Sequence, residues 1–314
     1  MVAFLSAGEV RVFAPATVAN LGLGFDILGL ALREPGDTVV ARLVSGQKTV
    51  TLKEVRGDGG QLSKDAASNT AGIAAIEVLK KAGIEAGIEL TLDKGLPIGS
   101  GMGSSAASAA AAALAVNLLL GSPLRKTDLI GPCIEAEAAV SGRHADNVAP
   151  AMLGGLILVR ALEPLDLLRL PVPDGLTIAV VSPRFELSTR KARSVLPEAV
   201  PLTALVRNTA NIAALVSAFH SGDLTVIARC VPDEVVTPVR AALIPGCMEV
   251  IRAALDAGAL GSSISGSGPS VFALCRSAVS AQKAAAAMVQ AFERAGLAAR
   301  AVVSPADSPG ARRI

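Results

Sequence analysis

The segment from Pro97 to Ala107 reads PIGSGMGSSAA, with glycine at alternate positions and two serines ahead of an alanine-rich stretch. Because glycine has no Cβ, the backbone of such a loop can approach a ligand closely. A helix that begins after the loop points its unpaired N–H groups and the positive end of its dipole at the same place. The hydroxyls of Ser104 and Ser105 can bind phosphate or a phosphate-bound metal. The segment therefore predicts an anion cradle, made of Pro97, Ile98, Gly99, Ser100, Gly101, Met102, Gly103, Ser104, Ser105, Ala106 and Ala107.

The loop is neither of the two common phosphate motifs. No Gly-Lys-Ser/Thr occurs in the chain, which excludes a Walker A loop, and Ser104 stands where the dinucleotide fingerprint needs its last glycine. A second interpretation stays open, in which the segment is only a flexible turn that caps a core helix.

The elements that must position this loop alternate between strands and helices without a regular βαβ order. Hydrophobic periodicity and turn residues predict them as follows. Strands are expected from Glu9 onward, in 37–55, and at Ile88–Leu92, Leu153–Val159, Leu176–Val181, Ala259–Ile264, Val271–Cys275 and Ala298–Val303. Helices are expected at Asn69–Lys81 (with Ser68 as N-cap), Ala106–Leu120, Lys126–Val140, Leu202–Phe219, Leu224–Cys230, Met248–Ala257 and Gln282–Arg294. The pattern indicates an α+β fold. Three prolines in Glu163–Gly175 place a boundary there and predict two domains, 1–165 and 166–314.

Composition excludes several classes of protein. Hydrophobic residues make up 51% of the 314 residues, so a large core is available, and the formal net charge of +2 is too balanced for a nucleic-acid-binding protein. The N-terminus lacks the basic lead and long apolar run of a signal peptide. The apolar stretch Ala106–Leu120 is too short to span a membrane and favours a fully buried helix. Four scattered cysteines indicate buried, reduced thiols rather than disulfides or zinc. A cytoplasmic protein without membrane or nucleic-acid partners is expected.

Three motifs together resemble those of the GHMP small-molecule kinases. The glycine loop is similar to the phosphate-binding loop of that family, APATVANLGLGFD (14–26) to its first motif and GSSISGSGPS (261–270) to its third, in the form found in members that phosphorylate homoserine. HADNVAP (144–150), STRKAR (188–193) and the final GAR (310–312) are similar to the same members. The resemblance covers essentially the whole chain.

This resemblance implies a two-domain GHMP kinase fold, with an N-terminal domain like domain 2 of ribosomal protein S5 and a ferredoxin-like C-terminal domain. It implies transfer of phosphate from ATP to the hydroxyl of L-homoserine, a step toward threonine, with Mg²⁺ as the metal. A homodimer, common among relatives, stays open.

The resemblance also assigns roles to single residues. Asn20 and Asp26 match residues that hold the ammonium and hydroxyl end of the substrate, and Arg193 and Arg240 match the pair that binds its carboxylate. A guanidinium fork suits a carboxylate because it donates two parallel hydrogen bonds. The remaining matches are Asn69 at the nucleotide, Thr189 near the transferred phosphate, His144 and Asn147 in the substrate pocket, and Ser105 with Glu137 at the magnesium ion. The residues expected to take part in catalysis are Asp26, Ser105, Glu137 and Thr189.

Alternatives remain at this stage. Taken alone, Glu137 would be a solvated helix residue, Asn20 a turn residue, and each arginine a surface charge. Another GHMP kinase, acting on a mevalonate derivative or a sugar, is the nearest rival, and a non-catalytic S5-like binding protein is a more distant one. The sequence shows no match to the Asp–Lys pair that some relatives use as a catalytic base, which leaves Asp26 as a candidate proton acceptor.

Overall fold

The long strand β2 (Leu28–Val44) organises the first of two sheets in the computed structural model, which describes residues 8–314. β2 pairs with β1 over most of its length, with β4 through Thr38–Val44, and with β5 through Leu28–Leu30. Because β2 meets different strands at its two ends, the sheet branches there. Its members in residues 8–314 are β1 (Glu9–Ala19), β2, β3 (Val50–Arg56), β4 (Gly87–Asp93), β5 (Leu156–Leu162), β6 (Leu165–Leu170) and β11 (Arg312–Arg313).

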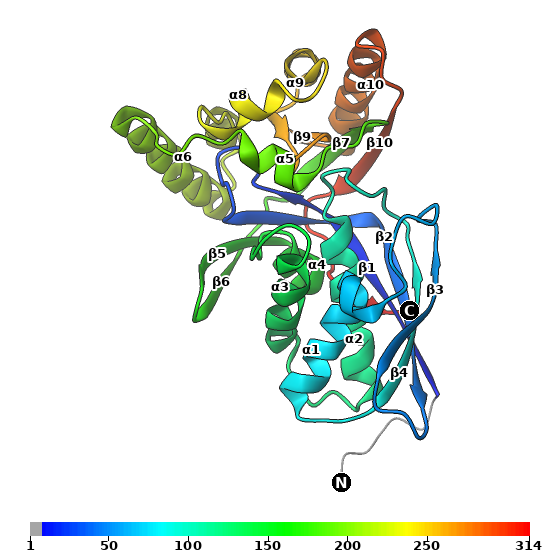
Figure 1. Cartoon of the computed structure of the whole chain (residues 1–314). Coiled ribbons are helices and arrows are strands. Elements are labelled where there is room, and N and C mark those ends of the chain that lie inside the picture. Colours follow the sequence, from blue (N-terminus) through cyan, green and yellow to red (C-terminus); the bar gives the residue numbers. More distant parts are fainter. Residues whose placement is uncertain (1–7) are drawn as a thin grey trace.

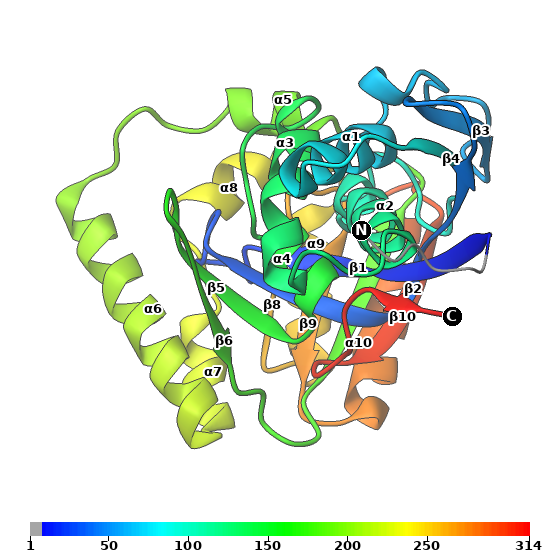
Figure 2. The same ribbon diagram turned by 90° about the horizontal axis from the view of Figure 1, so that it is seen from below.

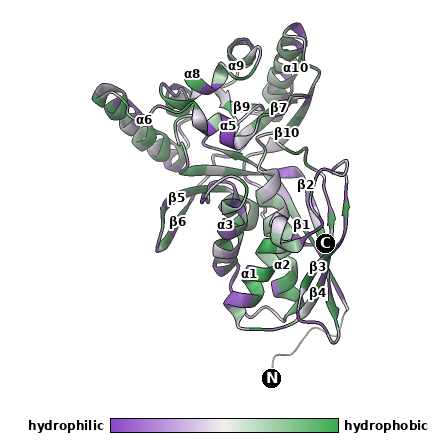
Figure 3. Ribbon diagram, in the orientation of Figure 1, coloured by the Kyte–Doolittle hydropathy of each residue, from purple (hydrophilic) through white to green (hydrophobic). Residues whose placement is uncertain are grey.

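Helix α2 (Ser104–Leu119) forms the centre of this part of the molecule, and every side chain from Ala106 to Asn117 is buried. Alanine side chains are small, so other elements can pack closely around the helix. These neighbours are α1 (Thr70–Ala82), α3 (Ile130–Ala138), α4 (Val148–Leu153) and the strands β1 and β2. Figure 1 shows the four helices gathered on one side of β1 and β2, and Figure 3 shows how apolar α2 is. The prediction of a fully buried helix is confirmed.

The second sheet has the strand order β10-β7-β9-β8 and is antiparallel throughout. Its strands are β7 (Thr177–Pro183), β8 (Gly261–Ile264), β9 (Val271–Cys275) and β10 (Ala299–Pro305), covered by α9 (Cys247–Asp256) and α10 (Ala278–Arg294). In chain order this is strand, helices, strand, strand, helix, strand, which is the expected ferredoxin-like arrangement. The two-part α+β fold is therefore confirmed.

The segment between β7 and α9 is helical, with α5 (Thr189–Ser194), α6 (Leu202–Ser221), α7 (Leu224–Cys230) and α8 (Val236–Ala241). Figure 2 shows α6 along the outer edge of the molecule, where it packs against α7. Within residues 8–314, α6 alone is long and apolar enough to cross a membrane by length and composition, and 17% of its apolar window is buried. The stretch weighed for this role in the sequence lies instead in the buried α2.

The domain boundary stays a prediction, but the structure adds detail around it. Strand β6 begins at residue 165 and still pairs with β5, and β11 returns the end of the chain to the first sheet. The second sheet begins only at Thr177.

Several local predictions change. Asn69, rather than Ser68, caps α1, because its side chain accepts a hydrogen bond from the backbone N–H of Ala71. The helix expected over Lys126–Val140 is split into the 3-10 turn η2 (Lys126–Leu129) and α3, with Pro132 in the first turn of α3. A further 3-10 turn, η1 (Ala66–Ser68), precedes α1. The short elements β6, α4, α5, α8 and β11 were not predicted, since two to six residues carry too little periodicity. The four cysteines are buried and free, as expected. Residues 1–7, on which most of the signal-peptide argument depends, lie outside the described part.

Candidate active site

A cavity of about 480 Å³ opens between the two parts of the molecule, and the glycine loop forms one of its walls. Gly99, Gly101 and Gly103 all have positive φ (64°, 77° and 65°), a conformation that favours glycine. The N-cap of α2 is Gly103, which has no side chain. The first backbone N–H groups of the helix therefore have no side-chain cap. Unpaired N–H groups at a helix N-terminus can bind an anion, and the anion cradle stays a prediction.

The third motif lies against this loop and ties it to the second sheet. The hydroxyl of Ser265 donates to the carbonyl of Gly101 (2.7 Å), and the hydroxyl of Ser270 donates to the carbonyl of Ser100 (2.6 Å). A Cβ at Gly101 would come within 2.6 Å of the carbonyl oxygens of Ser265 and Gly268. Gly101 is therefore required by the contact between the two loops.

Glu137 lines the cavity and has one buried carboxylate oxygen without a hydrogen-bond partner. It is buried on α3, where Oε2 accepts a hydrogen bond from Ser141 (2.9 Å), while Oε1 has no partner among the described residues. Burial raises the pKa of Glu137, and the hydroxyls of Ser105 and Ser141 and the charge of Lys94 oppose that shift. An orphaned buried carboxylate oxygen beside a serine hydroxyl fits a hard cation such as Mg²⁺. By contrast, Glu135 lies on the surface and pairs with Arg143 (2.6 Å).

At the other end of the cavity, Arg193 leaves a buried donor unsatisfied. Its Nη2 donates to Asp26 (2.7 Å) and lies 3.3 Å from Nδ1 of His144, but its Nε has no partner in residues 8–314. Nε2 of His144 lies 3.2 Å from the carbonyl of Ser141. Burial lowers the pKa of His144, and Asp26 opposes that shift. With a carbonyl beside Nε2 and the arginine N–H beside Nδ1, the geometry fits the tautomer that carries its proton on Nε2.

Arg240 is 2% exposed and forms the base of this end. Its Nε donates to the carbonyl of Ala192 (3.1 Å), and its Nη1 donates to that of Gly266 (3.0 Å). Its guanidinium lies 5.0 Å from the centre of the Phe25 ring, and that of Arg193 lies 5.3 Å from the same ring. Phe25 thus holds both arginines through cation–π contacts, although no pattern in the sequence singled it out.

Asn20 and Asn147 are held by protein groups. The amide of Asn20 donates to the carbonyl of Gly266 (2.9 Å), and its Oδ1 accepts from the backbone N–H of Asp26 (3.1 Å). Asn20 and Asp26 both have positive φ (70° and 61°), and the Asn20 bonds fix this strained turn. Oδ1 of Asn147 accepts from the buried Thr17 hydroxyl (2.7 Å).

Most of the predicted site residues line the cavity. They are Asn20, Asp26, Asn69, Ile98, Gly99, Ser100, Gly101, Gly103, Ser104, Ser105, Glu137, His144, Asn147, Thr189, Arg193 and Arg240. Those that do not are Pro97, Met102, Ala106 and Ala107. Met102 is buried and accepts a hydrogen bond at its sulfur from Ser182 (3.1 Å), and the two alanines belong to the core of α2. Met102 and the two alanines support the loop from behind, whereas Pro97 is exposed.

Three charged residues of the lining were missed in the sequence: Asp146, Lys94 and the exposed Arg190. Asp146 is buried, and burial together with the charges of Asp26 and Glu137 raises its pKa to about 7. It lies inside HADNVAP, so its position in that segment was the available signal. Lys94 is also buried, in an ion pair with Asp37, and contacts Ser104 and Ser108 of α2. Its partner lies 57 residues away in sequence, and no local pattern joins the two.

Two family models match the chain. Residues 69–155 match the GHMP kinases N terminal domain, and residues 215–294 match the GHMP kinases C terminal. The chain is 46% identical to a homoserine kinase of Chlorobaculum tepidum, over 96% of this chain and 97% of that protein. It is 47% identical to a homoserine kinase of Arabidopsis thaliana, over 98% of this chain and 85% of that one.

The solved structures include a homoserine kinase from Cytophaga hutchinsonii that superposes with a TM-score of 0.95 at 45% identity, covering 98% of each chain. Both family domains match, and the similarity to these relatives extends over nearly the full length. The chain therefore belongs to the GHMP kinase family, among its homoserine kinases.

Proposed function

We propose that this protein transfers the γ-phosphoryl group of ATP to the side-chain hydroxyl of L-homoserine, giving O-phospho-L-homoserine and ADP on the way to threonine. The proposal rests on two buried atoms without hydrogen-bond partners, both in residues that line the same cavity. One is an acceptor, Oε1 of Glu137, and the other is a donor, Nε of Arg193. A buried polar atom without a partner is costly, which indicates that each is completed by a ligand. The carboxylate oxygen of Glu137 suits a cation, and the guanidinium N–H of Arg193 suits an anion.

The nucleotide end consists of the glycine loop and α2. Its backbone N–H groups and the hydroxyls of Ser104 and Ser105 receive the phosphates, while Leu62, Ile98 and Asn69 line the cavity beside them. Since the chain has no Trp or Tyr, the adenine lies among aliphatic side chains. Asn69 already uses its side chain to cap α1 and to bond Ser63, so it shapes this wall.

Glu137 and Ser105 would hold Mg²⁺ with the phosphate oxygens. When bound, this ion neutralises charge on the phosphates that are transferred and released. Among the described residues no group of three or more acidic, histidine or cysteine side chains could hold a metal ion, so Glu137 would be the main protein ligand.

The acceptor end recognises the two charges of an amino acid. Arg193 and Arg240 bind the carboxylate, and Asp26 provides negative charge for the ammonium group. The missed Asp146, whose pKa is raised to about 7, offers oxygen acceptors in the same cavity. Asn20 holds Asp26 in place, while His144 and Asn147 shape the pocket around the hydroxyl. Thr189, whose hydroxyl lies 3.3 Å from that of Ser267, borders the phosphate that moves.

Catalysis rests on positioning and charge neutralisation, which supply most of the rate in phosphoryl transfer. Asp26 is the proton acceptor nearest the proposed hydroxyl, although Arg193 already engages it. We propose a cytoplasmic enzyme that binds only small molecules, with a homodimer left open.

The test is an ADP-release assay with L-homoserine, mevalonate, galactose and L-threonine as acceptors. L-Homoserine should support turnover at a kcat/KM at least 100 times that of the others, and chelation of Mg²⁺ should abolish it. Greater turnover with mevalonate or galactose would refute the acceptor assignment. RNA binding tighter than micromolar at physiological salt, without turnover, would favour the S5-like binding protein.

A further inference from the structure

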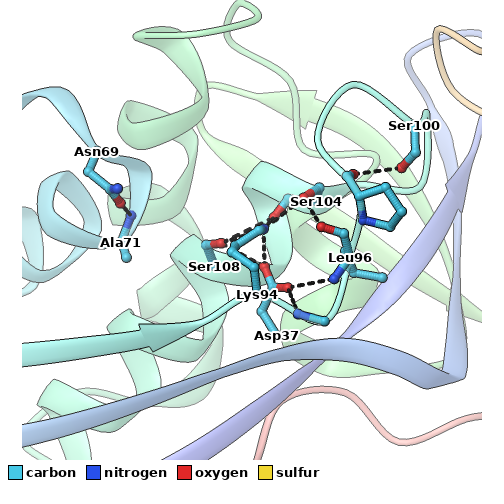
Figure 4. Close-up of polar contacts among 10 residues, drawn as sticks. Asp37, Asn69, Ala71, Lys94, Leu96, Ser100, Ser104 and Ser108 are labelled. Atoms are coloured by element: carbon cyan, nitrogen blue, oxygen red, sulfur yellow. Dashed lines mark hydrogen bonds and ion pairs between the residues drawn. The ribbon is translucent and has the colours of Figure 1, made fainter. Parts of the chain in front are cut away.

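A buried ion pair lies beside the phosphate-binding loop, and no role in recognising either substrate accounts for it. The side chain of Asp37 is 0% exposed and that of Lys94 is 2% exposed. Figure 4 shows the pair between β2, where Asp37 lies, and the first turn of α2, with the start of the glycine loop alongside. Taking two charges out of water is expensive, and such a pair contributes little net stability compared with apolar residues of similar size.

Asp37 fixes the chain where it enters the loop. Its Oδ1 accepts hydrogen bonds from the backbone N–H groups of Gly95 (3.0 Å) and Leu96 (3.2 Å), directly before Pro97. A Cβ at Gly95 would lie 2.1 Å from the carbonyl oxygen of Gly36, so the chain passes here in close contact with β2. The entry to the loop is thereby attached to the first sheet.

Lys94 fixes the chain where it leaves the loop. Its Nζ donates to Asp37, and it lies within hydrogen-bond distance of the Ser104 carbonyl (2.9 Å), the Ser104 hydroxyl (2.7 Å) and the Ser108 hydroxyl (3.0 Å). The Ser108 hydroxyl in turn donates to Oδ2 of Asp37 (2.7 Å). Every polar atom of the cluster therefore has a partner, and the cluster joins both ends of the loop.

The sign of the charge excludes a simple helix-stabilising role. A helix dipole favours negative charge at its N-terminus, yet the side chain bound to the first turn of α2 is a lysine. The carboxylate of Asp37 is fully engaged and shielded from the cavity, which also makes it unsuitable as a catalytic base. Lys94 borders the cavity, but its Nζ is already bonded to Asp37 and Ser104 and its side chain is buried, so control of the loop geometry remains.

We propose that Asp37 and Lys94 are positioning residues that set the shape of the loop 97–103 for the triphosphate of the nucleotide. The inference rests on the proposed use of ATP, but not on the identity of the acceptor. It predicts that the hydrogen bonds of the pair matter more than its net charge, since a neutral pair with the same bonds would hold the same two chain segments.

Two double variants separate these contributions, and neither leaves a single unpaired charge in the core. Asp37→Leu with Lys94→Met removes both the charges and the bonds. Asp37→Asn with Lys94→Gln removes the charges but keeps an acceptor for Gly95 and Leu96 and a donor for Ser104. The control, Lys53→Met with Glu89→Leu, removes an exposed pair between β3 and β4 of the same sheet.

The Kd for ATP is measured by calorimetry without an acceptor, so that failure of the homoserine assignment would leave this result unaffected. The Leu/Met variant should bind ATP at least 10-fold more weakly and lose kcat, while its KM for homoserine changes less than twofold. The Asn/Gln variant should recover to within about threefold of wild type, and the control should match wild type. Wild-type affinity in the Leu/Met variant would overturn the proposal. Equal loss in both double variants would also overturn it, because the charge itself would then be responsible.

If the Leu/Met variant does not fold, Ser108→Ala provides the same test with both charges retained. Loss of this one bridging hydroxyl should weaken ATP binding about 2- to 10-fold. It should also speed amide hydrogen exchange in residues 95–103 while leaving α10 unchanged. Unchanged affinity and unchanged exchange would refute the positioning role.

Discussion

At the nucleotide end of the cavity the lining comes mostly from one continuous segment, Ile98–Ser108, whereas at the acceptor end Asp26, His144, Arg193 and Arg240 come from four separate parts of the chain. The nucleotide end depends on backbone: positive φ at three glycines and the start of a helix. The acceptor end depends on side chains, whose positions are set by ion pairs, carbonyls and the ring of Phe25. This difference implies that steric changes should damage the first end, and that changes of charge should damage the second.

The largest effect is expected for Gly101→Val. The new Cβ would meet the carbonyl oxygens of Ser265 and Gly268 at 2.6 Å, in a backbone conformation that valine disfavours. We expect ATP turnover to be lost and the melting temperature to fall, since overpacking alone costs about 1–3 kcal/mol. Kinetics and thermal unfolding measure both.

The control for this variant is Gly99→Ala, because a Cβ at Gly99 would meet only the Leu187 carbonyl oxygen, at 3.9 Å. It should keep most of the stability, at a backbone cost of about 1–2 kcal/mol. A folded, fully active Gly101→Val enzyme would remove the loop from the mechanism.

Glu137→Gln tests the charge at the nucleotide end, where shape alone should not be enough. The amide keeps the size of the side chain but removes the charge proposed to hold Mg²⁺, and turnover should fall at least ~100-fold. The Kd for nucleotide measured without metal should change little, and the melting temperature should not fall, because a buried charge has been removed.

Glu135→Gln is the matched control on the same helix, and it removes only a surface pair with Arg143. Its turnover should stay within about twofold of wild type, since exposed pairs contribute little. A greater loss in Glu135→Gln than in Glu137→Gln would contradict the metal assignment.

Arg240→Leu tests the acceptor end. Charge-assisted hydrogen bonds contribute roughly 1.5–3 kcal/mol, so the KM for homoserine should rise about 10- to 150-fold. The KM for ATP should hardly move. Because Arg240 also bonds the carbonyls of Ala192 and Gly266, the melting temperature should fall as well.

Two comparisons sharpen this test. Arg240→Lys should recover only part of the loss, since an ammonium group cannot reproduce the guanidinium fork. A homoserine analogue without the carboxylate should be a poor substrate of the wild type and should lose much less on mutation. Collapse of ATP affinity with homoserine affinity spared would place Arg240 at the nucleotide.

The smallest effect is expected for Asp146→Asn, at a residue on which the charges of both Asp26 and Glu137 act. Burial raises the folded-state pKa of Asp146 to about 7, far above its ordinary value. Between pH 4 and 7 the Asp146 carboxyl is ionised in the unfolded chain and protonated in the folded chain. The contribution of Asp146 to the free energy of unfolding is therefore present at low pH and is lost as the pH rises toward 7. Asparagine resembles the protonated form at every pH.

The melting temperature of Asp146→Asn relative to wild type should therefore rise from pH 4 to pH 7 and then level off, by on the order of 5 °C. Thermal unfolding at four pH values measures it. A difference that does not change with pH would show that Asp146 does not titrate in this range.

Much of the fold was predictable because local patterns report local structure. The strand Val271–Cys275 and the helix Leu224–Cys230 were predicted with the correct bounds, and the alanine-rich helix was placed correctly in the core. Boundaries failed where a single side chain or proline decided them, as at Asn69 and Pro132. The shortest elements were missed because tertiary packing, rather than periodicity, holds them.

The sequence by itself determined the glycine loop, since the phosphate binding proposed for it depends on consecutive backbone groups that residue types alone specify. The residues of the acceptor end, which are separated along the chain, were identified only through the resemblance to the family. Only the tertiary structure decided what each side chain is free to do: Asn20 and Asn147 are occupied by protein partners, whereas Glu137 and Arg193 keep unsatisfied atoms. The pairing of Asp37 with Lys94 likewise required the fold, because adjacent strands bring together charges that lie far apart along the chain.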